Sequence, residues 1–248
     1  MKIKSFVYQW LTRVQILYPS QYFSQKLMIP IALKTIILYD TKNKKRRLYV
    51  IQSINKVYGE NMIHLIRHMQ AENNSKLLVG GDYPLTEKGI HDGEKLREHI
   101  KLKPDLLVVS PLIRAQQTAQ ILFPQREFII DNAFREIHFG DYEDTPEVEN
   151  EFLKTFKTTP SRLHEVTHGD IIKERADRAI IKMLDYLHKG EVVIVCHDTL
   201  IRSIICRLKG ESLDNMPKYS SLLSNGSILK LDFSATIELT NERGKMIL

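Results

Sequence analysis

The sequence predicts an α/β fold in which helices flank a mainly parallel central sheet. Three short segments are almost continuously apolar: "MIHLIR" (62–67), "DLLVVS" (105–110) and "EVVIVCH" (191–197). Runs of this length and composition indicate buried strands. A segment with helical character follows the second and the third, and strands that alternate with helices are typical of a sheet covered on both faces.

Two helices are expected between the first and the third of these strands. The segment "LTEKGIHDGEKLREHI" (85–100) places Thr86 where a capping residue belongs, and its apolar residues recur roughly in helical phase. Ser110 and Pro111 offer an N-cap and a first-turn proline for "LIRAQQTAQIL" (112–122). Both helices therefore have a predicted start.

Two more helices are expected around the third strand. Asp170 is the predicted cap of a long helix, in which apolar residues between 172 and 187 share one face. The amphipathic segment "TLIRSIICRL" (199–208) predicts a helix directly after the strand, and "GSILKLDF" (226–233) predicts a late strand. Elements of both kinds thus continue to the C-terminal part of the chain.

Charge divides the 248 residues into two parts. Residues 1–61 hold 11 Lys and Arg against Asp40 and Glu60, a net charge of +9, whereas residues 62–248 hold 25 basic and 28 acidic residues, a net charge of −3. This asymmetry predicts a boundary near Met62. We expect a basic N-terminal extension (1–61) and one α/β domain (62–248), a size that supports a sizeable core.

The basic extension has more than one interpretation. A run of charges such as "KNKKRR" (42–47) favours a solvated extension over an arm that binds nucleic acid or an anionic membrane surface, although nucleic acid stays open. A further hypothesis is that residues 1–61 are a translated leader and that the natural protein begins at Met62. The codons for "GENM" (59–62) would be purine-rich and would resemble a bacterial ribosome-binding site before a start codon.

Cysteine use and hydropathy predict a cytoplasmic protein. Cys196 and Cys206 lie in apolar surroundings and form neither a disulfide framework nor a zinc-binding pattern, which favours a reducing compartment. The longest apolar run, 27–39, is interrupted by Pro30 and Lys34 and is shorter than the ~20 residues that a spanning helix needs. The N-terminus lacks the order of a secretory signal, so no membrane span is expected.

The stretch "HLIRHMQAENN" (64–74) carries two histidines four residues apart. On a helix the pair would resemble a zinc site, but the segment is β-rich and the glutamate of H-E-x-x-H is missing. We therefore predict no metal site. In a strand only His68 reaches the carboxyl end, where α/β sheets place their ligands, and His64 is expected to be a core residue.

Five segments together resemble a known family. They are Arg67-His68 with Asn74, "DYPLTEKG" (82–89), "SPLIRAQQTA" (110–119), "REIHFGDYED" (135–144) and "VIVCHDTLIR" (193–202). In this order they resemble the signature of the histidine phosphatase superfamily, the phosphoglycerate-mutase-like fold, and they cover most of 62–248. The resemblance implies a three-layer sandwich with a mainly parallel central sheet, and residues 1–61 have no counterpart in it.

The resemblance implies a metal-independent phosphatase that needs no cofactor and hydrolyses a small phosphorylated substrate. A phosphoryl group in transfer carries spread negative charge, so catalysis is largely positioning and electrostatic stabilisation. Arg67 and Arg114 would hold its oxygens with their planar forks, Asn74 would add a neutral donor, and His197 would add a charged donor if protonated. His68 would be the nucleophile that forms a phosphohistidine.

The proton donor has two candidates. The resemblance implies Glu136, which would protonate the leaving group and then activate water. Asp198 replaces the glycine that usually follows the second histidine, and in the acid-phosphatase branch of the superfamily a His-Asp pair provides the proton. Asp198 is therefore an alternative to Glu136. Met69 also departs from the pattern, where a small residue is usual, and predicts a narrower or more apolar pocket wall.

Three functions remain open from the sequence. Residues 62–248 contain no long insertion of the kind that shields the phosphoenzyme of mutases, and 145–169 are predicted to form the lid over the pocket. A lid that admits water favours phosphatase activity. The alternatives are a phosphoglycerate-type mutase on the same scaffold and a catalytically weak phosphate-binding or adaptor protein that uses the basic extension as its contact surface.

Overall fold

The computed structural model describes residues 62–146, 155–156, 158–160 and 171–232, and it also gives the backbone of four strands nearer the N-terminus. These four strands are β1 (Gln9–Leu17), β2 (Ile29–Lys34), β3 (Leu38–Asp40) and β4 (Lys45–Arg47). The helices of the described domain are α1 (Glu72–Lys76), α2 (Glu87–His99), α3 (Ile113–Leu122), α5 (Ile172–Tyr186) and α6 (Asp198–Lys209). Short 3-10 helices are η2 (Asn132–Phe134), η3 (Gly140–Tyr142), η6 (Leu187–Lys189) and η7 (Leu213–Leu222).

The strands form a mixed sheet in the order β2-β1-β9-β5-β8-β6-β7. Parallel pairing joins β5 (Met62–Arg67), β8 (Val192–Cys196), β6 (Leu106–Val109) and β7 (Ile129–Ile130). The late strand β9 (Ile228–Asp232) runs antiparallel to β5 on one side and to β1 on the other. The predicted α/β fold with parallel strands at its centre is confirmed, and β9 makes the complete sheet mixed.

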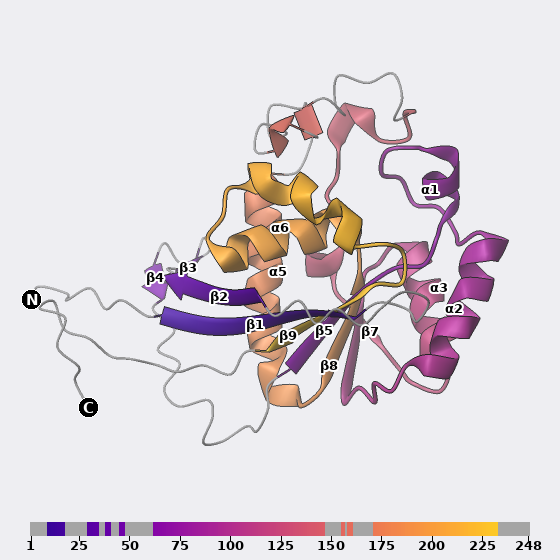
Figure 1. Cartoon of the computed structure of the whole chain (residues 1–248), viewed down its shortest axis with the longest axis horizontal. Helices are drawn as coiled ribbons and strands as arrows, with labels where there is room; N and C mark the ends of the chain where they lie inside the picture. Colours follow the sequence, from indigo (N-terminus) through magenta and orange to yellow (C-terminus); the bar gives the residue numbers. More distant parts are fainter. Residues whose placement is uncertain are drawn as a thin grey trace, which may run out of the picture.

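Helices cover both faces of this sheet, α2 and α3 on one side and α5 and α6 on the other (Figure 1). Strand β6 shows how the core is divided. Val109 packs into one apolar cluster together with Ala119 of α3, whereas Val108 belongs to a second cluster with Met183 of α5. Successive side chains of a strand point to opposite faces. Because helices cover both faces, the all-apolar strands "LLVV" and "VVIVC" can bury every side chain.

The helix starts only partly follow the sequence prediction. Thr86 caps α2 as expected, because its hydroxyl accepts a hydrogen bond from the backbone N–H of Gly89 at 3.0 Å. The prediction of Ser110 as the cap of α3 is wrong. The N-cap residue is Leu112, and the Ser110 hydroxyl lies 2.6 Å from a ring nitrogen of His197. The predicted cap Asp170 lies outside the described residues.

Two predictions about chain organisation are not tested by the described residues. Of the predicted lid at 145–169, only 145–146, 155–156 and 158–160 are described, and the other positions lie outside. The division into a basic extension (1–61) and a domain (62–248) stays a prediction.

In the part of the chain that the structure describes, no helix is both long enough and apolar enough to cross a membrane.

Candidate active site

The ends of strands β5 and β8 place the two histidines of the predicted site next to each other. The strands are parallel neighbours with Arg67 opposite Cys196, so His68 and His197 leave the sheet at adjacent points. The backbone N–H of His68 donates to the carbonyl of Cys196 at 3.0 Å. The two ring centroids lie 5.1 Å apart. This edge is the carboxyl end of the parallel strands, where α/β folds bind their ligands.

His68 is held as a neutral imidazole with one tautomer. Its Nδ1 lies 2.7 Å from the carbonyl oxygen of Met69, and because a carbonyl oxygen only accepts, Nδ1 carries the proton. The lone pair is therefore on Nε2, to which Arg114 Nε donates at 3.2 Å. Burial and then the charges of Arg114 and Arg67 lower the pKa of His68 well below its usual value. The ring thus has the protonation state of a nucleophile.

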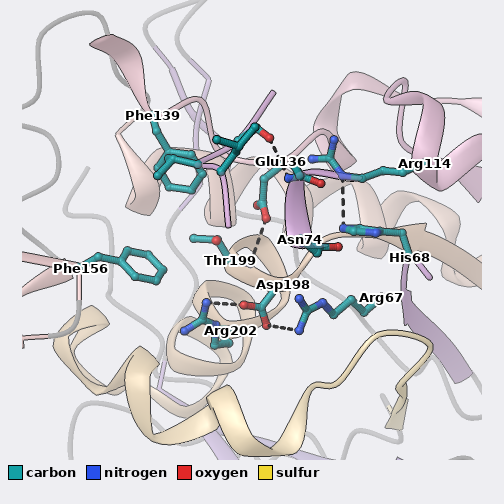
Figure 2. Close-up of a pocket in the computed structure, with 14 residues that line it drawn as sticks. Arg67, His68, Asn74, Arg114, Glu136, Phe139, Phe156, Asp198, Thr199 and Arg202 are labelled. Atoms are coloured by element: carbon teal, nitrogen blue, oxygen red, sulfur yellow. Dashed lines mark hydrogen bonds and ion pairs between the residues drawn. The ribbon is translucent and has the colours of Figure 1, made fainter. Parts of the chain in front are cut away.

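The two predicted phosphate-binding arginines approach the same pocket from different elements. Arg114 is almost fully buried, and besides His68 its guanidinium contacts the carbonyl oxygen of Gly81 through Nη1 at 2.7 Å. Arg67, the last residue of β5, donates through Nη1 to the carbonyl oxygen of Leu223. Figure 2 shows Arg114 and Arg67 on either side of His68, with their guanidinium groups directed to the pocket.

Asn74 is fixed so that its amide nitrogen remains for the pocket. Its Oδ1 accepts from the backbone N–H of Ala71 at 3.1 Å, and it lies 3.4 Å from Nδ2 of Asn225. The same Asn225 nitrogen donates to the carbonyl oxygen of His68 at 3.0 Å. Asn225 therefore ties α1 to the segment that carries His68. No sequence motif singled it out, because its partners are about 150 residues away.

His197 lies behind His68 rather than in the pocket wall. It is fully buried, and its Nε2 lies 2.6 Å from the Ser110 hydroxyl. Its Nδ1 has no hydrogen-bond partner among the described residues. Burial, followed by the charge of Arg114, lowers the pKa of His197 well below its usual value. The ring is therefore neutral in this environment, and its predicted role as a charged donor stays a prediction.

Glu136 is a buried carboxyl group at the start of helix α6. Its Oε1 accepts from the backbone N–H of Ile137 at 2.9 Å and of Leu200 at 3.1 Å, and Oε2 accepts from Thr199 at 3.2 Å. Burial raises the pKa of Glu136, and the nearby charge of Asp198 raises it further, against the opposing effect of these donors. A buried carboxyl with a raised pKa at a pocket is suited to donate a proton.

Asp198 has a different environment, because it bridges two arginines. Its carboxylate pairs with Arg202 one turn further along α6, and its Oδ1 lies 3.5 Å from Nη1 of Arg67. Asp198 and Arg202 also line the pocket. This geometry favours Glu136 over Asp198 as the proton donor. Sequence reasoning missed Arg202, although an acid and a base four residues apart on a predicted helix are a signal for such a pair.

The pocket at these side chains has a volume of about 120 Å³. This is small beside the ~300–1,000 Å³ of sites for drug-sized ligands. Six of the seven predicted site residues line it, and they are Arg67, His68, Asn74, Arg114, Glu136 and Asp198. Opposite His68, Phe139 and Phe156 form an edge-to-face pair with ring centroids 6.2 Å apart (Figure 2). The pocket therefore has a cationic end and an aromatic end.

The Glu143 carboxylate holds together two backbone segments near the pocket. Glu143 accepts hydrogen bonds from the backbone N–H groups of Gly81 and Phe139, the latter at 2.8 Å. Gly80 adopts a positive φ of 60°, and a Cβ on it would lie 2.2 Å from a Glu143 oxygen. Glu143 thus joins the segment that binds Arg114 to the segment that carries Phe139.

The expectation that Met69 shapes the pocket wall is wrong. Its side chain is 4% exposed and packs with Leu96 in the apolar cluster on the α2 and α3 side of the sheet. Gly226 makes room for it, since a Cβ there would lie 2.9 Å from the Met69 sulfur. The Met69 side chain therefore serves packing, while its backbone carbonyl holds the His68 ring.

The fold and this site define a class of protein. A neutral buried imidazole, three guanidinium groups and a buried carboxyl around one small pocket are typical of an enzyme that acts on phosphate esters. The chain belongs to the histidine phosphatase superfamily (branch 1), because the sequence profile of this family matches residues 63–238. Among the described residues, no group of three or more His, Cys, Asp or Glu side chains is arranged to hold a metal ion.

Individual relatives include phosphatases and mutases. The chain is 32% identical to a 2,3-bisphosphoglycerate-dependent phosphoglycerate mutase of Bartonella henselae, over 61% of this chain and 82% of the relative. It is 25% identical to an adenosylcobalamin/alpha-ribazole phosphatase of Escherichia coli, over 72% and 95%. A solved alpha-ribazole phosphatase of Shigella flexneri superposes with a TM-score of 0.60 at 25% identity, over 75% and 99%. The prediction of a phosphatase-type enzyme with this fold is confirmed by the family.

Proposed function

We propose that this protein hydrolyses phosphomonoesters without a metal ion, through a phosphohistidine formed on His68. The observation that supports it most directly is the neutral His68 ring, whose Nε2 lone pair faces the pocket 3.2 Å from Arg114 Nε. An uncharged imidazole can attack phosphorus, whereas an imidazolium has no lone pair to offer. The phosphatases among the relatives support hydrolysis as the outcome.

The first step transfers the phosphoryl group to the protein. Nε2 of His68 forms a bond to phosphorus, the bond from phosphorus to the ester oxygen breaks, and Glu136 protonates that oxygen as it leaves. The phosphoryl oxygens take over the Arg114 donor that contacts Nε2 in the structure. Their negative charge raises the pKa of His197, because a nearby anion favours the imidazolium. His197 then stabilises the group together with Arg67 and Asn74.

The second step returns the site to its starting state. Glu136, now ionised, takes a proton from a water molecule that attacks phosphorus on the side the leaving group has vacated. The bond from phosphorus to Nε2 breaks, and inorganic phosphate departs. One carboxyl group can serve both steps because its raised pKa lies nearer to neutral pH than that of a solvated glutamate.

Glu136→Gln is expected to lower kcat/KM for alkyl phosphates by ~10²–10⁴-fold, since general acid catalysis contributes that much. The same change should affect p-nitrophenyl phosphate far less, because its leaving group hardly needs a proton. Steady-state phosphate release from both substrates checks this. Asp198→Asn is the matched comparison, and a leaving-group asymmetry in that variant, with none in Glu136→Gln, would assign the donor to Asp198 instead.

A phosphoglycerate-type mutase is the second candidate, favoured by the mutase of Bartonella henselae among the relatives. A panel of phosphomonoesters that includes 3-phosphoglycerate, assayed with excess chelator, separates the possibilities. Inorganic phosphate released at an unchanged rate with chelator is the expected result. Formation of 2-phosphoglycerate with a bisphosphate primer would indicate the mutase. Binding of phosphate without turnover of any ester would indicate a catalytically weak phosphate-binding protein and contradict the proposal.

A further inference from the structure

The floor of the pocket carries a negative charge that phosphate transfer does not use. Asp198 lines the pocket next to Thr199, and its carboxylate lies between Arg67 and Arg202 (Figure 2). Arg67 is one of the two arginines proposed to hold the phosphoryl group. Only the Arg67 guanidinium would therefore separate Asp198 from the reacting phosphate. A carboxylate at this distance from a bound anion contributes repulsion that Arg67 offsets only in part.

Arg202 does not provide a free binding group for a second anion. Its Nη2 pairs with Asp198, and its Nη1 donates to the Ser220 hydroxyl at 3.1 Å. Its Nε is buried, and the ring of Phe156 covers its guanidinium at 5.0 Å from the centroid. Arg202 thus lines the pocket with a guanidinium group that is paired with Asp198 on one side and stacked on the Phe156 ring on the other.

Part of the wall beyond the phosphate position is apolar. Phe139 and Phe156 meet edge to face there, and Leu78 and Val79 also line the pocket. Aromatic rings favour contact with the hydrocarbon part of a ligand and especially with another ring. A leaving group that extends from phosphorus toward this wall would pass Asp198 on its way.

We propose that Asp198 makes the pocket selective for phosphomonoesters whose leaving group is uncharged and apolar or aromatic, and that it rejects esters with a second negative group near the phosphate. This inference rests on the proposed phosphatase function and deepens it by naming the substrate class. It also separates the chain from enzymes for phosphorylated carboxylic acids, because a substrate carboxylate would lie against Asp198.

The test compares esters of nearly the same shape that differ in charge. The probes are 3- and 4-carboxyphenyl phosphate, each paired with its carbamoylphenyl counterpart, which has nearly the same shape. The wild-type protein is expected to favour the uncharged member by about tenfold in kcat/KM, from the repulsion of two like charges a few ångströms apart. In Asp198→Asn this ratio should fall close to one. Because each ratio is measured within one variant, a general loss of activity cancels.

Two further variants control the comparison. Asp177→Asn removes the same charge from a surface pair with Arg207, which lies 2.6 Å away on α6, and should leave the ratio at its wild-type value. Arg202→Met deprives Asp198 of one partner and should raise the ratio above wild type, which keeps the test decisive if Asp198→Asn fails to fold.

The outcomes distinguish this inference from the function on which it rests. Equal use of both esters by the wild-type protein, or a ratio that Asp198→Asn leaves unchanged, overturns the specificity role while hydrolysis itself stands. Preference for the carboxylate ester overturns it as well, because it would show that attraction by Arg202 outweighs repulsion by Asp198. Absence of turnover with every ester contradicts the phosphatase function, and the inference fails with it.

Discussion

His68→Ala is expected to lower kcat/KM for p-nitrophenyl phosphate by at least ~10³-fold, because removal of a nucleophile abolishes the covalent route. The variant should also carry no acid-labile phosphate after brief mixing with a ³²P-labelled phosphomonoester. Rapid acid-free quenching, followed by measurement of label on the protein before and after acid treatment, checks the second point. The wild-type protein should show a label that alkali preserves and acid removes.

The control for this experiment is His91→Ala. His91 is an exposed residue on α2, so its loss should change neither turnover nor label. The backbone of His68 is held by the carbonyl of Cys196 independently of its side chain, and a thermal melt should show that His68→Ala is folded. Label that persists in His68→Ala would move the nucleophile to another residue, with neighbouring His197 as the first to examine.

Arg114→Met is expected to reduce kcat/KM by ~10²–10³-fold, the usual effect of removing one donor that stabilises transition-state charge. It should also move the acidic limb of the pH profile of kcat/KM upward. His68 must be neutral to react, and after burial the largest cause of its lowered pKa is the charge of Arg114. Without that charge the pKa of His68 rises, so His68 is protonated, and activity lost, at a higher pH than in the wild-type protein.

Arg114→Lys separates the two effects of this residue. Lysine keeps the positive charge but lacks the fork that serves two oxygens at once, so kcat/KM should fall while the acidic limb stays near its wild-type position. The full pH dependence of kcat/KM with one substrate for all three proteins provides the comparison. An acidic limb that does not move in Arg114→Met would show that the guanidinium does not control the charge state of His68.

The elements that hold the site could be predicted from the sequence because they depend on local patterns. The strand "MIHLIR" and the helix after Thr86 follow from apolar runs and a capping residue within a few positions. His68 could be placed at the edge of the sheet since parallel strands all end on the same side. The same rule places His197 at this edge, and the parallel pairing of β5 with β8 sets the two histidines beside each other.

Contacts that depend on side-chain direction could not be predicted. Ser110 looked like a helix cap, but its hydroxyl faces a histidine 87 residues away. Met69 looked like part of the pocket, but its side chain packs in the apolar cluster with residues of α2 and α3 and fills space left by Gly226. In both cases the partner comes from a distant part of the chain, and the identity of the residue does not reveal that partner.

Glu136 accepts hydrogen bonds from two backbone N–H groups of α6, so a change in its charge during turnover also affects this helix. A charged carboxylate is a stronger acceptor than a neutral acid, so the first turn of α6 is anchored more firmly in the phosphorylated protein than in the free one. The same turn carries Asp198, beside the leaving group's exit route. Amide hydrogen exchange at Thr199 and Leu200 would then be slower in the phosphorylated protein than in the free protein. The first turn of α6 would therefore become more and less rigid as the phosphohistidine forms and is hydrolysed.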